Sequence, residues 1–316
     1  MKSYQFALTG IATGLMLTLT GCNQPASTSQ NTEASTTAST TPTTQTTNLS
    51  TPSYKVIVDA EYPPYDFRDE KGNAMGFDVD ILNAIAKNQG FNITVVPMPW
   101  NTVMPKVADG SYDIGMGGMS PGDIEDEGFA DKITQSYAYA YGIDTIASIS
   151  PIITDYQSLK NYKVATLADS AYIADMKELM GANTKANLTE TKTVFLGYQK
   201  LVNGEVDAVL ADKGVLAYFV KQHPLKTADK KVNIDTKGFY FDRYYPMTII
   251  SKKDNPELAQ KINKGIEAVV KDGTYAKIHQ QWFGRTPKVL PKPEPIPLDD
   301  SRFVPVPSDV ASAVKP

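Results

Sequence analysis

Acidic and aromatic side chains follow the predicted strands of this chain at the points where those strands end. The first strand covers the β-branched run Val56–Val58 and leads directly into the segment DAEYPPY, residues 59 to 65. In open α/β sheets, ligands bind in the crevice at the carboxyl ends of the strands. We therefore expect one cleft, lined by Asp59, Glu61, Tyr62, Tyr65, Trp100, Asp123, Glu125 and Asp212.

The segment Gly118–Gly122 has the pattern G-x-S-x-G, which in serine hydrolases places a nucleophilic serine after a strand. The oxyanion hole of such an enzyme needs the backbone N–H of the residue after the serine, and here that residue is Pro121, which has none. The sequence therefore favours a flexible polar loop around Ser120 over a hydrolase. The acids and bases that follow in hydrolase order are Asp207, Asp212, His223 and His279.

Metal, nucleotide and nucleic-acid chemistry have no support in the composition. The two histidines have no clustered partners, and the chain has no G-x-x-x-x-G-K-[ST] loop, so we expect no metal and no cofactor. The formal charge is −4, with lysine and arginine spread evenly, which leaves no basic face for nucleic acid.

Strand and helix patterns alternate between Tyr54 and Gly284, which predicts an α/β fold with a largely parallel sheet. Asp78 is expected to cap a helix whose apolar residues recur at helical spacing. The same rhythm returns after an extended segment near residue 140 and implies a second lobe. Thr193 and Val194 are expected in a strand there, and a later helix is expected to begin with Asn255 as its N-cap.

The two ends of the chain differ in composition from its middle. Lys2, a mostly apolar run and the sequence Leu-Thr-Gly-Cys, ending at Cys22, resemble a bacterial lipoprotein signal peptide, residues 1–21, with Cys22 as the lipidated residue. The alternative is a transmembrane helix with an inert cysteine, but the apolar run is shorter than the roughly 20 residues that span a bilayer. Residues 22–53 then form a disordered Thr/Ser-rich linker, and residues 285–316 a proline-rich extended tail.

A series of segments in a fixed order resembles the family 3 bacterial extracellular solute-binding proteins of amino-acid ABC importers. The series is EYPPYDF, GNAMGFDVDILNAIA, WNTVMPKVADGSYDIGMGGMS, FAD, LVNGEVDAVLAD and NPELAQKINKGIEAVVKDGTYAKIHQQWFG. The resemblance implies a two-lobed type II periplasmic-binding-protein fold with two crossing segments and a cleft between the lobes. Lobe 1 would be residues 54–141 plus 249–284, and lobe 2 residues 142–248.

The resemblance also implies partners and ligand-binding residues. It implies a monomer, held at a bacterial membrane outside the cytoplasm by its lipid, that delivers a small-molecule ligand to an ABC permease with a separate ATPase. The ligand-binding residues expected in this way, or from their place at strand ends, are Asp59, Glu61, Tyr62, Tyr65, Trp100, Gly117, Gly118, Met119, Ser120, Glu125, Ser170 and Asp212. In the family, aromatic residues stack on the ligand side chain, and the last aspartate binds the α-ammonium group.

The sequence departs from the family where the ligand's α-carboxylate binds. The family's clamp arginine is replaced by Glu125, its serine pair by Gly117 and Gly118, and its G-T-T anion loop by residues 169–171, Asp-Ser-Ala. An acidic residue at that place would repel a carboxylate. One hypothesis is a ligand that is cationic or lacks a free α-carboxylate, held by Glu125, Asp212, Tyr62 and Trp100. The alternative is a shifted alignment, with Arg243 or a lysine as the clamp.

The same fold also occurs in periplasmic cyclohexadienyl dehydratases, which act on an amino-acid-like substrate. No acid/base pair in this sequence singles out that activity. We therefore predict a binding protein that is not an enzyme.

Overall fold

The structure is a computed structural model that describes residues 51–296 apart from 151–152, 154, 225–231 and 236–242, together with 304–305. The described residues belong to one compact unit, residues 49–316. The predicted signal peptide, Cys22 and most of the predicted linker lie outside the described residues, as do residues 297–303 and 306–316 of the tail. No helix in the described part of the chain has the length and apolar character needed to cross a membrane.

The first of two large sheets is built around the apolar run near the start of the domain, and it defines lobe 1. Its main path runs β14-β13-β6-β1-β5, and β7 also pairs with β13. Strands β6, β1 and β5 are parallel, with Val56 opposite both Val95 and Ile114, whereas β13 runs antiparallel. The strands are β1 (Ser53–Asp59), β5 (Asn92–Met98), β6 (Ile114–Met116), β7 (Ile133–Gly142), β13 (Arg243–Lys252) and β14 (Val304–Pro305).

Helices of this lobe include α1 (Phe77–Gln89), α2 (Val103–Ala108), α8 (Pro256–Lys271) and α9 (Thr274–Phe283). The prediction that Asp78 caps α1 is wrong, because the N-cap is Gly76, which lies against the backbone of Tyr65 where a Cβ would meet the carbonyl oxygen at 2.0 Å. Asp78 is instead buried and accepts a hydrogen bond of 2.7 Å from the Tyr139 hydroxyl. The predicted N-cap of α8 is confirmed, since Asn255 accepts from the N–H of Leu258.

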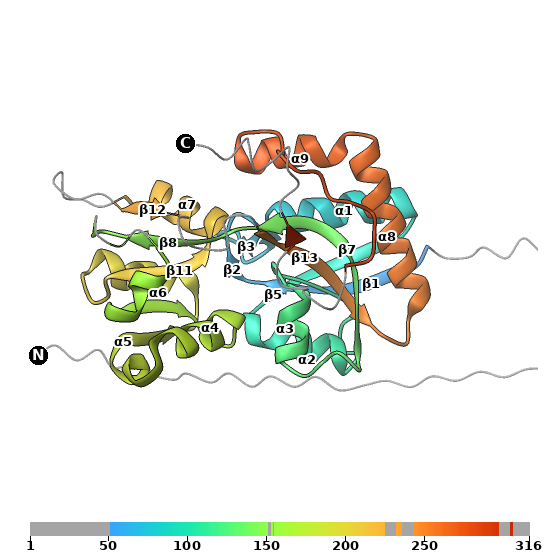
Figure 1. Cartoon of the computed structure of the whole chain (residues 1–316). Helices are drawn as coiled ribbons and strands as arrows, with labels where there is room; N and C mark the ends of the chain where they lie inside the picture. The colour runs from blue at the N-terminus through green and yellow to red at the C-terminus, as the bar shows by residue number, and fades with distance from the viewer. Residues whose placement is uncertain are drawn as a thin grey trace, which may run out of the picture. The chain divides into compact units, whose positions relative to one another are not determined.

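The second large sheet defines lobe 2 and has the order β10-β9-β11-β8-β12. Its strands are β8 (Asp144–Ser148), β9 (Val164–Leu167), β10 (Leu188–Thr191), β11 (Ala208–Asp212) and β12 (Asn233–Asp235). The helices α4 (Ala171–Met180), α5 (Thr184–Asn187), α6 (Val194–Val202) and α7 (Lys213–Gln222) accompany it, and Figure 1 shows these elements grouped together, apart from β1, β5 and α1. The strand predicted at Thr193 is wrong, because its side chain caps α6 by accepting from the N–H of Leu196.

Short elements complete the fold. A three-stranded sheet, β2 (Glu61–Tyr62), β3 (Asp66–Arg68) and β4 (Ala74–Met75), carries the aromatic segment that follows β1. The helix α3 (Pro121–Asp126) follows β6, and 3₁₀ turns occur at Trp100–Thr102, Gln157–Asn161 and Gly181–Asn183.

The chain passes between the lobes along β7 and β13. These strands pair antiparallel, with Tyr245 opposite Gly142, so both crossings lie side by side at the point where β7 leads towards β8. The described tail residues 285–296 form no helix or strand, but the backbone of Lys292 hydrogen-bonds the Tyr141 hydroxyl, and β14 pairs with β13. The described part of the tail is therefore attached at the crossing strands. The predicted lobe bounds stay a prediction.

Gly265 of α8 offers a test of the packing in lobe 1. A Cβ at this position would lie 2.5 Å from Cγ2 of Ile85 on α1, inside a buried contact. We expect Gly265→Val to lower the free energy of unfolding by about 1–3 kcal/mol through overpacking. Urea unfolding measures it, with Lys264→Val, at an exposed position of the same helix, as the control for β-branching. Equal stability of the two variants would contradict this packing.

Candidate functional site

A cavity lies between the two lobes and brings together residues from seven helices and strands and from two loops. Lobe 1 contributes Tyr62, Trp100, Gly117, Gly118, Ser120 and Asp123; lobe 2 contributes Asp144, Leu167, Ser170, Ala171, Tyr172 and Asp175; and Tyr245 comes from the crossing strand β13. Six of the residues predicted as ligand-binding are in this lining: Tyr62, Trp100, Gly117, Gly118, Ser120 and Ser170.

Trp100 joins the two lobes directly. Its indole Nε1–H donates a hydrogen bond of 2.8 Å to the carbonyl oxygen of Asp169, 69 residues further along the chain. Asp169 has φ of 53°, a left-handed conformation that is uncommon for a residue other than glycine. Strained backbone of this kind clusters at functional sites, and here the strained residue provides the acceptor for a contact between lobes.

Gly118, the second glycine after β6, makes room for an aromatic ring. A Cβ at Gly118 would lie 2.9 Å from Cε1 of Tyr62, and Gly118 also has a positive φ of 70°. A serine here, as in the family pattern, would push this ring from its place. The glycine that stands in place of the family's serine therefore allows the ring of Tyr62 to lie in the cavity wall.

The predicted flexible loop around Ser120 is wrong, because a helix begins there. Ser120 is the N-cap of α3, and its backbone N–H and hydroxyl donate to Oδ2 of Asp123 at 2.8 and 2.7 Å. This reciprocal capping box, with proline at the first helical position, was readable as Ser-Pro-Gly-Asp in the sequence. Asp123 is thereby held against the cavity, and the Ser120 hydroxyl has an acidic rather than a basic partner.

Asp212 does not line this cavity, although it was expected to bind the α-ammonium group. It is 1% exposed, caps α7 by accepting from the N–H groups of Gly214 and Val215, and accepts from the Tyr245 hydroxyl at 2.8 Å and the N–H of Ile143 at 3.3 Å. Tyr245, which does line the cavity, thus lies between Asp212 and the cavity. Asp212 and Tyr65 line a second cavity, between α7 and α9.

The other predicted residues lie behind or outside the lining. Asp59 is buried at the end of β1, where its side chain accepts from the N–H groups of Ala60 and Glu61. Glu61 is exposed, and Met119 is fully buried. Glu125 is exposed on α3 and is absent from the lining, so the acidic side chain that α3 directs to the cavity is that of Asp123. Their roles in ligand binding stay predictions.

Sequence reasoning missed several lining residues of lobe 2. Tyr172 and Asp175 are one helical turn apart near the start of α4, so an i, i+3 pattern following the predicted anion loop would have indicated them. Asp144 begins β8 and accepts a hydrogen bond of 2.6 Å from the Tyr172 hydroxyl. Tyr245 gave no signal beyond its place near a crossing segment.

The described lining contains three aspartates, Asp123, Asp144 and Asp175, and no lysine, arginine or histidine. Burial raises the pKa of Asp144 to about 7, and the nearby charge of Asp212 adds to this effect, while the hydrogen bond from Tyr172 opposes it. Burial likewise raises the pKa of Asp123. The cavity therefore favours a bound cation, which would stabilise the ionised form of these carboxyls.

A second acidic group lies beneath the wall of lobe 1. Asp59 donates its backbone N–H to Oδ2 of Asp66 at 3.0 Å, and burial raises the pKa of Asp59 and Asp78 to about 7 and that of Asp66 well above its usual value. One oxygen each of Asp66 and Asp78 is buried without a hydrogen-bond partner among the described residues. Three further aspartates thus lie behind the wall of lobe 1.

Comparison with known proteins identifies the family. The model of the bacterial extracellular solute-binding proteins, family 3, matches residues 54–285. The chain belongs to this family. Its members work outside the cytoplasm, and this chain therefore binds a solute for an ABC importer of the amino-acid type, as the sequence predicted.

Three relatives illustrate the likeness of this family 3 member. The ABC transporter arginine-binding protein 1 of Escherichia coli (strain K12) is 27% identical over 235 residues, 72% of this chain and 88% of the relative. The structure of an ancestral arginine-binding protein bound to arginine has a TM-score of 0.63 and 30% identity, covering 73% of this chain and 98% of the other. An ancestral amino-acid-binding protein, described as a precursor of cyclohexadienyl dehydratase, has a TM-score of 0.60 and 27% identity, covering 73% and 95%. The predicted two-lobed fold is confirmed.

The raised pKa of Asp144 predicts how stability depends on pH. A carboxyl whose pKa is raised by folding contributes stability below its unfolded pKa near 4, and this contribution is lost as pH rises through about 7. The wild-type protein should lose unfolding free energy between pH 4.5 and 7.5. In Asp144→Asn, which keeps an acceptor for Tyr172, we expect this loss to be smaller by about 1–2 kcal/mol. The effect is modest because the side chain of Asp144 is only partly buried. Urea unfolding at several pH values measures this. Asp131→Asn, at an exposed position, is the control, and parallel pH profiles of wild type and Asp144→Asn would contradict the prediction.

Proposed function

We propose that this protein is a membrane-anchored, monomeric binding protein that captures a small amino-acid-like or amine-containing cation by closure of its two lobes. It delivers this ligand to an ABC permease whose ATPase is a separate subunit. The observation that carries the proposal is the acidic, aromatic lining of the cavity, which combines three aspartates with Tyr62, Trp100, Tyr172 and Tyr245.

The aromatic and acidic groups suit one class of ligand. The faces of Tyr62 and Trp100 attract a cation through their ring quadrupoles, and the aspartates compensate its charge. Aspartates come from both lobes, Asp123 from α3 and Asp144 and Asp175 from lobe 2, so closure without a cation brings like charges together. A cationic ligand therefore binds the closed state better than the open one, which is what drives closure.

The carboxylate clamp expected in the family has no counterpart in the described lining. Lysine is absent from that lining, and the side chain of Arg243, the alternative clamp, lies outside the described residues. Glu125, at the family's arginine position, is exposed. These placements support a ligand selected by its positive charge.

Capture by closure is testable by small-angle X-ray scattering with and without ligand. Native mass spectrometry of protein purified without denaturation first identifies a co-bound small molecule, expected to be basic, which is then removed and added back. We expect the radius of gyration to fall on its addition. Trp100→Phe, which removes the indole donor to Asp169, should bind roughly 5–10-fold more weakly, as expected for the loss of about one hydrogen bond. A ligand that binds without any change in scattering, or an acidic co-bound molecule, would contradict the proposal.

The membrane anchor rests on the sequence of the amino terminus, where an apolar run ends at Cys22. We expect Cys22→Ser to abolish lipidation and to move the protein from the membrane fraction to the soluble fraction when it is expressed in a bacterium. Labelling with a radioactive or alkyne-tagged fatty acid measures the first effect. Ser27→Ala, which leaves the lipobox intact, is the control, and continued labelling of the Cys22→Ser protein would refute the anchor.

The alternative function is that of a dehydratase with the same fold, and the likeness to a binding-protein precursor of cyclohexadienyl dehydratase is the observation that favours testing it. We propose that the chain is not an enzyme and needs no cofactor. Turnover of prephenate or arogenate by the purified domain would overturn this.

A further inference from the structure

Aromatic rings from both lobes and from a crossing strand line the cavity. Tyr62 and Trp100 belong to lobe 1, Tyr172 to α4 of lobe 2 and Tyr245 to β13. Tyr62 packs one face on Tyr65, with the ring centroids 5.7 Å apart, which leaves its opposite face for the cavity. The faces of aromatic rings attract cations through their quadrupoles. A cation in this cavity therefore meets rings of lobe 1, of lobe 2 and of the crossing strand.

Hydrogen bonds within the protein fix the orientation of three of these rings. The Tyr172 hydroxyl donates to Asp144 at 2.6 Å, and the Tyr245 hydroxyl donates to Asp212 at 2.8 Å. The indole N–H of Trp100 is likewise used, in its contact between the lobes. Since these polar groups are already engaged, a ligand meets the rings themselves.

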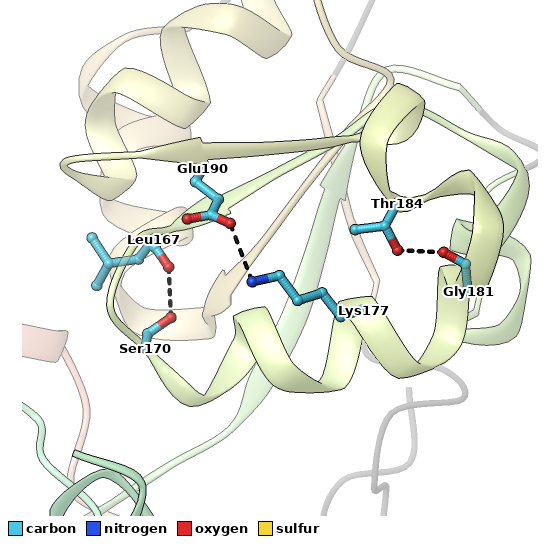
Figure 2. A network of polar contacts seen from close by, with 6 residues as sticks. All are labelled: Leu167, Ser170, Lys177, Gly181, Thr184 and Glu190. Carbon is cyan, nitrogen blue, oxygen red and sulfur yellow. Dashed lines mark hydrogen bonds and ion pairs between the residues drawn. The ribbon is translucent and has the colours of Figure 1, made fainter. Parts of the chain in front are cut away.

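The serine hydroxyls of the lining are engaged as well. Ser170 donates to the carbonyl oxygen of Leu167 at 2.6 Å, as Figure 2 shows, and Ser120 donates to Oδ2 of Asp123 at 2.7 Å. Five of the six hydroxyl and indole groups in the described lining thus donate to acceptors of the protein. A polar ligand group would lose its hydrogen bonds to water and find few side-chain donors to replace them.

The aspartates of the lining supply negative charge, and part of their hydrogen-bonding capacity is already used. Asp144 accepts from Tyr172, and Oδ2 of Asp123 accepts from both the N–H and the hydroxyl of Ser120. A primary ammonium group has three N–H donors that must replace bonds to water, whereas a fully methylated ammonium group has none. Both carry the same charge and are attracted by carboxylates. The lining therefore favours a cation that needs no hydrogen bonds.

The remaining lining residues suit methyl groups. Leu167 and Ala171 offer apolar side chains, and Gly117 and Gly118 have no side chain beyond Cα. Methyl groups on a ligand nitrogen gain free energy when they leave water for such a surface. Alkylation of the nitrogen thus adds favourable contacts while it removes unsatisfied donors.

We propose that the cavity selects a quaternary ammonium ion, whose methylated nitrogen lies among the rings of Tyr62, Trp100, Tyr172 and Tyr245 and is balanced by the aspartates of both lobes. This inference rests on the proposed function, because it names the ligand class of the same cleft.

The experiment compares primary amines with their trimethylated forms, so that the members of each pair differ in three methyl groups. Isothermal titration calorimetry on the protein freed of its co-bound ligand measures ethanolamine against choline, glycine against glycine betaine and lysine against Nε-trimethyllysine. We expect at least one trimethylated compound to bind, at least tenfold more tightly than its primary amine. A smaller preference in any bound pair, or no binding of any of the three trimethylated compounds, would overturn the proposal.

A neutral compound of the same shape separates charge from apolar fit. In 3,3-dimethyl-1-butanol a carbon atom replaces the nitrogen of choline, so the charge is lost and the methyl groups remain. We expect this alcohol to bind at least tenfold more weakly than choline, or not at all. Binding as tight as that of choline would reduce the site to an apolar pocket and overturn the proposal.

Variants of Tyr62 test the role of the rings with the trimethylated compound that binds most tightly. Tyr62→Leu removes the ring and Tyr62→Phe keeps it, so we expect the Leu variant to bind at least fivefold more weakly than the Phe variant. If Tyr62→Leu fails to fold, the same pair of changes at Tyr172 of lobe 2 replaces it. Tyr162→Leu, at a partly buried position of lobe 2 outside the lining, is the matched control and should keep the wild-type affinity. Equal affinities of the Leu and Phe variants would overturn the proposal.

The outcomes also separate this inference from the proposed function. Closure of the lobes around a primary amine would leave capture of a cation in place and overturn only the selection of a quaternary nitrogen. Absence of any ligand-dependent closure, measured by small-angle X-ray scattering with the co-bound molecule, would overturn the proposed function itself.

Discussion

The repulsion between carboxylates that face each other across the cleft is the constraint on which the arrangement of this protein depends. Asp123 projects from lobe 1, and Asp144 and Asp175 from lobe 2, into one cavity without a lysine, arginine or histidine in its described lining. Burial makes their ionised forms costly, as the raised pKa of Asp144 and Asp123 indicates. A cation bound between these carboxylates offsets both their mutual repulsion and the cost of burying their charge. Binding and closure are therefore a single event.

Hydrogen bonds within the protein fix the positions of the groups that line the cavity. The Trp100 donor and the left-handed Asp169 set the spacing of the lobes on one side. Near the crossing strands, the buried carboxylate of Asp212 accepts hydrogen bonds from N–H groups at the start of α7 and from the Tyr245 hydroxyl. Asp212 therefore positions Tyr245 in the cavity wall, and its acceptor capacity is largely used within the protein.

The sequence predicted the fold well, because the features that determine it are local. The apolar β-branched run of β1, the Asn-Pro start of α8 and the ordered series of family segments each act within a few residues. The errors have local causes too. Gly76, and not Asp78, is the N-cap of α1, because the close approach to Tyr65 needs a residue without a Cβ. The strand β10 was not predicted, because its sequence is mostly polar and only one of its four residues is buried.

The site was predicted less completely, because its chemistry depends on contacts between lobes. The family resemblance placed an acidic residue, Glu125, at the position of the clamp arginine. In the structure, the capping box of α3 directs Asp123, two residues earlier, to the cavity. The hydrogen bond from Trp100 to the carbonyl oxygen of Asp169 joins residues 69 positions apart, and no local pattern predicts such a pairing. Asp144, Tyr172 and Asp175 are likewise recognisable as a group only once lobe 2 is folded.

A crystal structure of the domain with its bound ligand tests the central claim most directly. The account predicts closed lobes and a cationic group of the ligand among Asp123, Asp144, Asp175 and the rings of Tyr62 and Trp100. A ligand with a carboxylate among these aspartates and no cationic group there would contradict it.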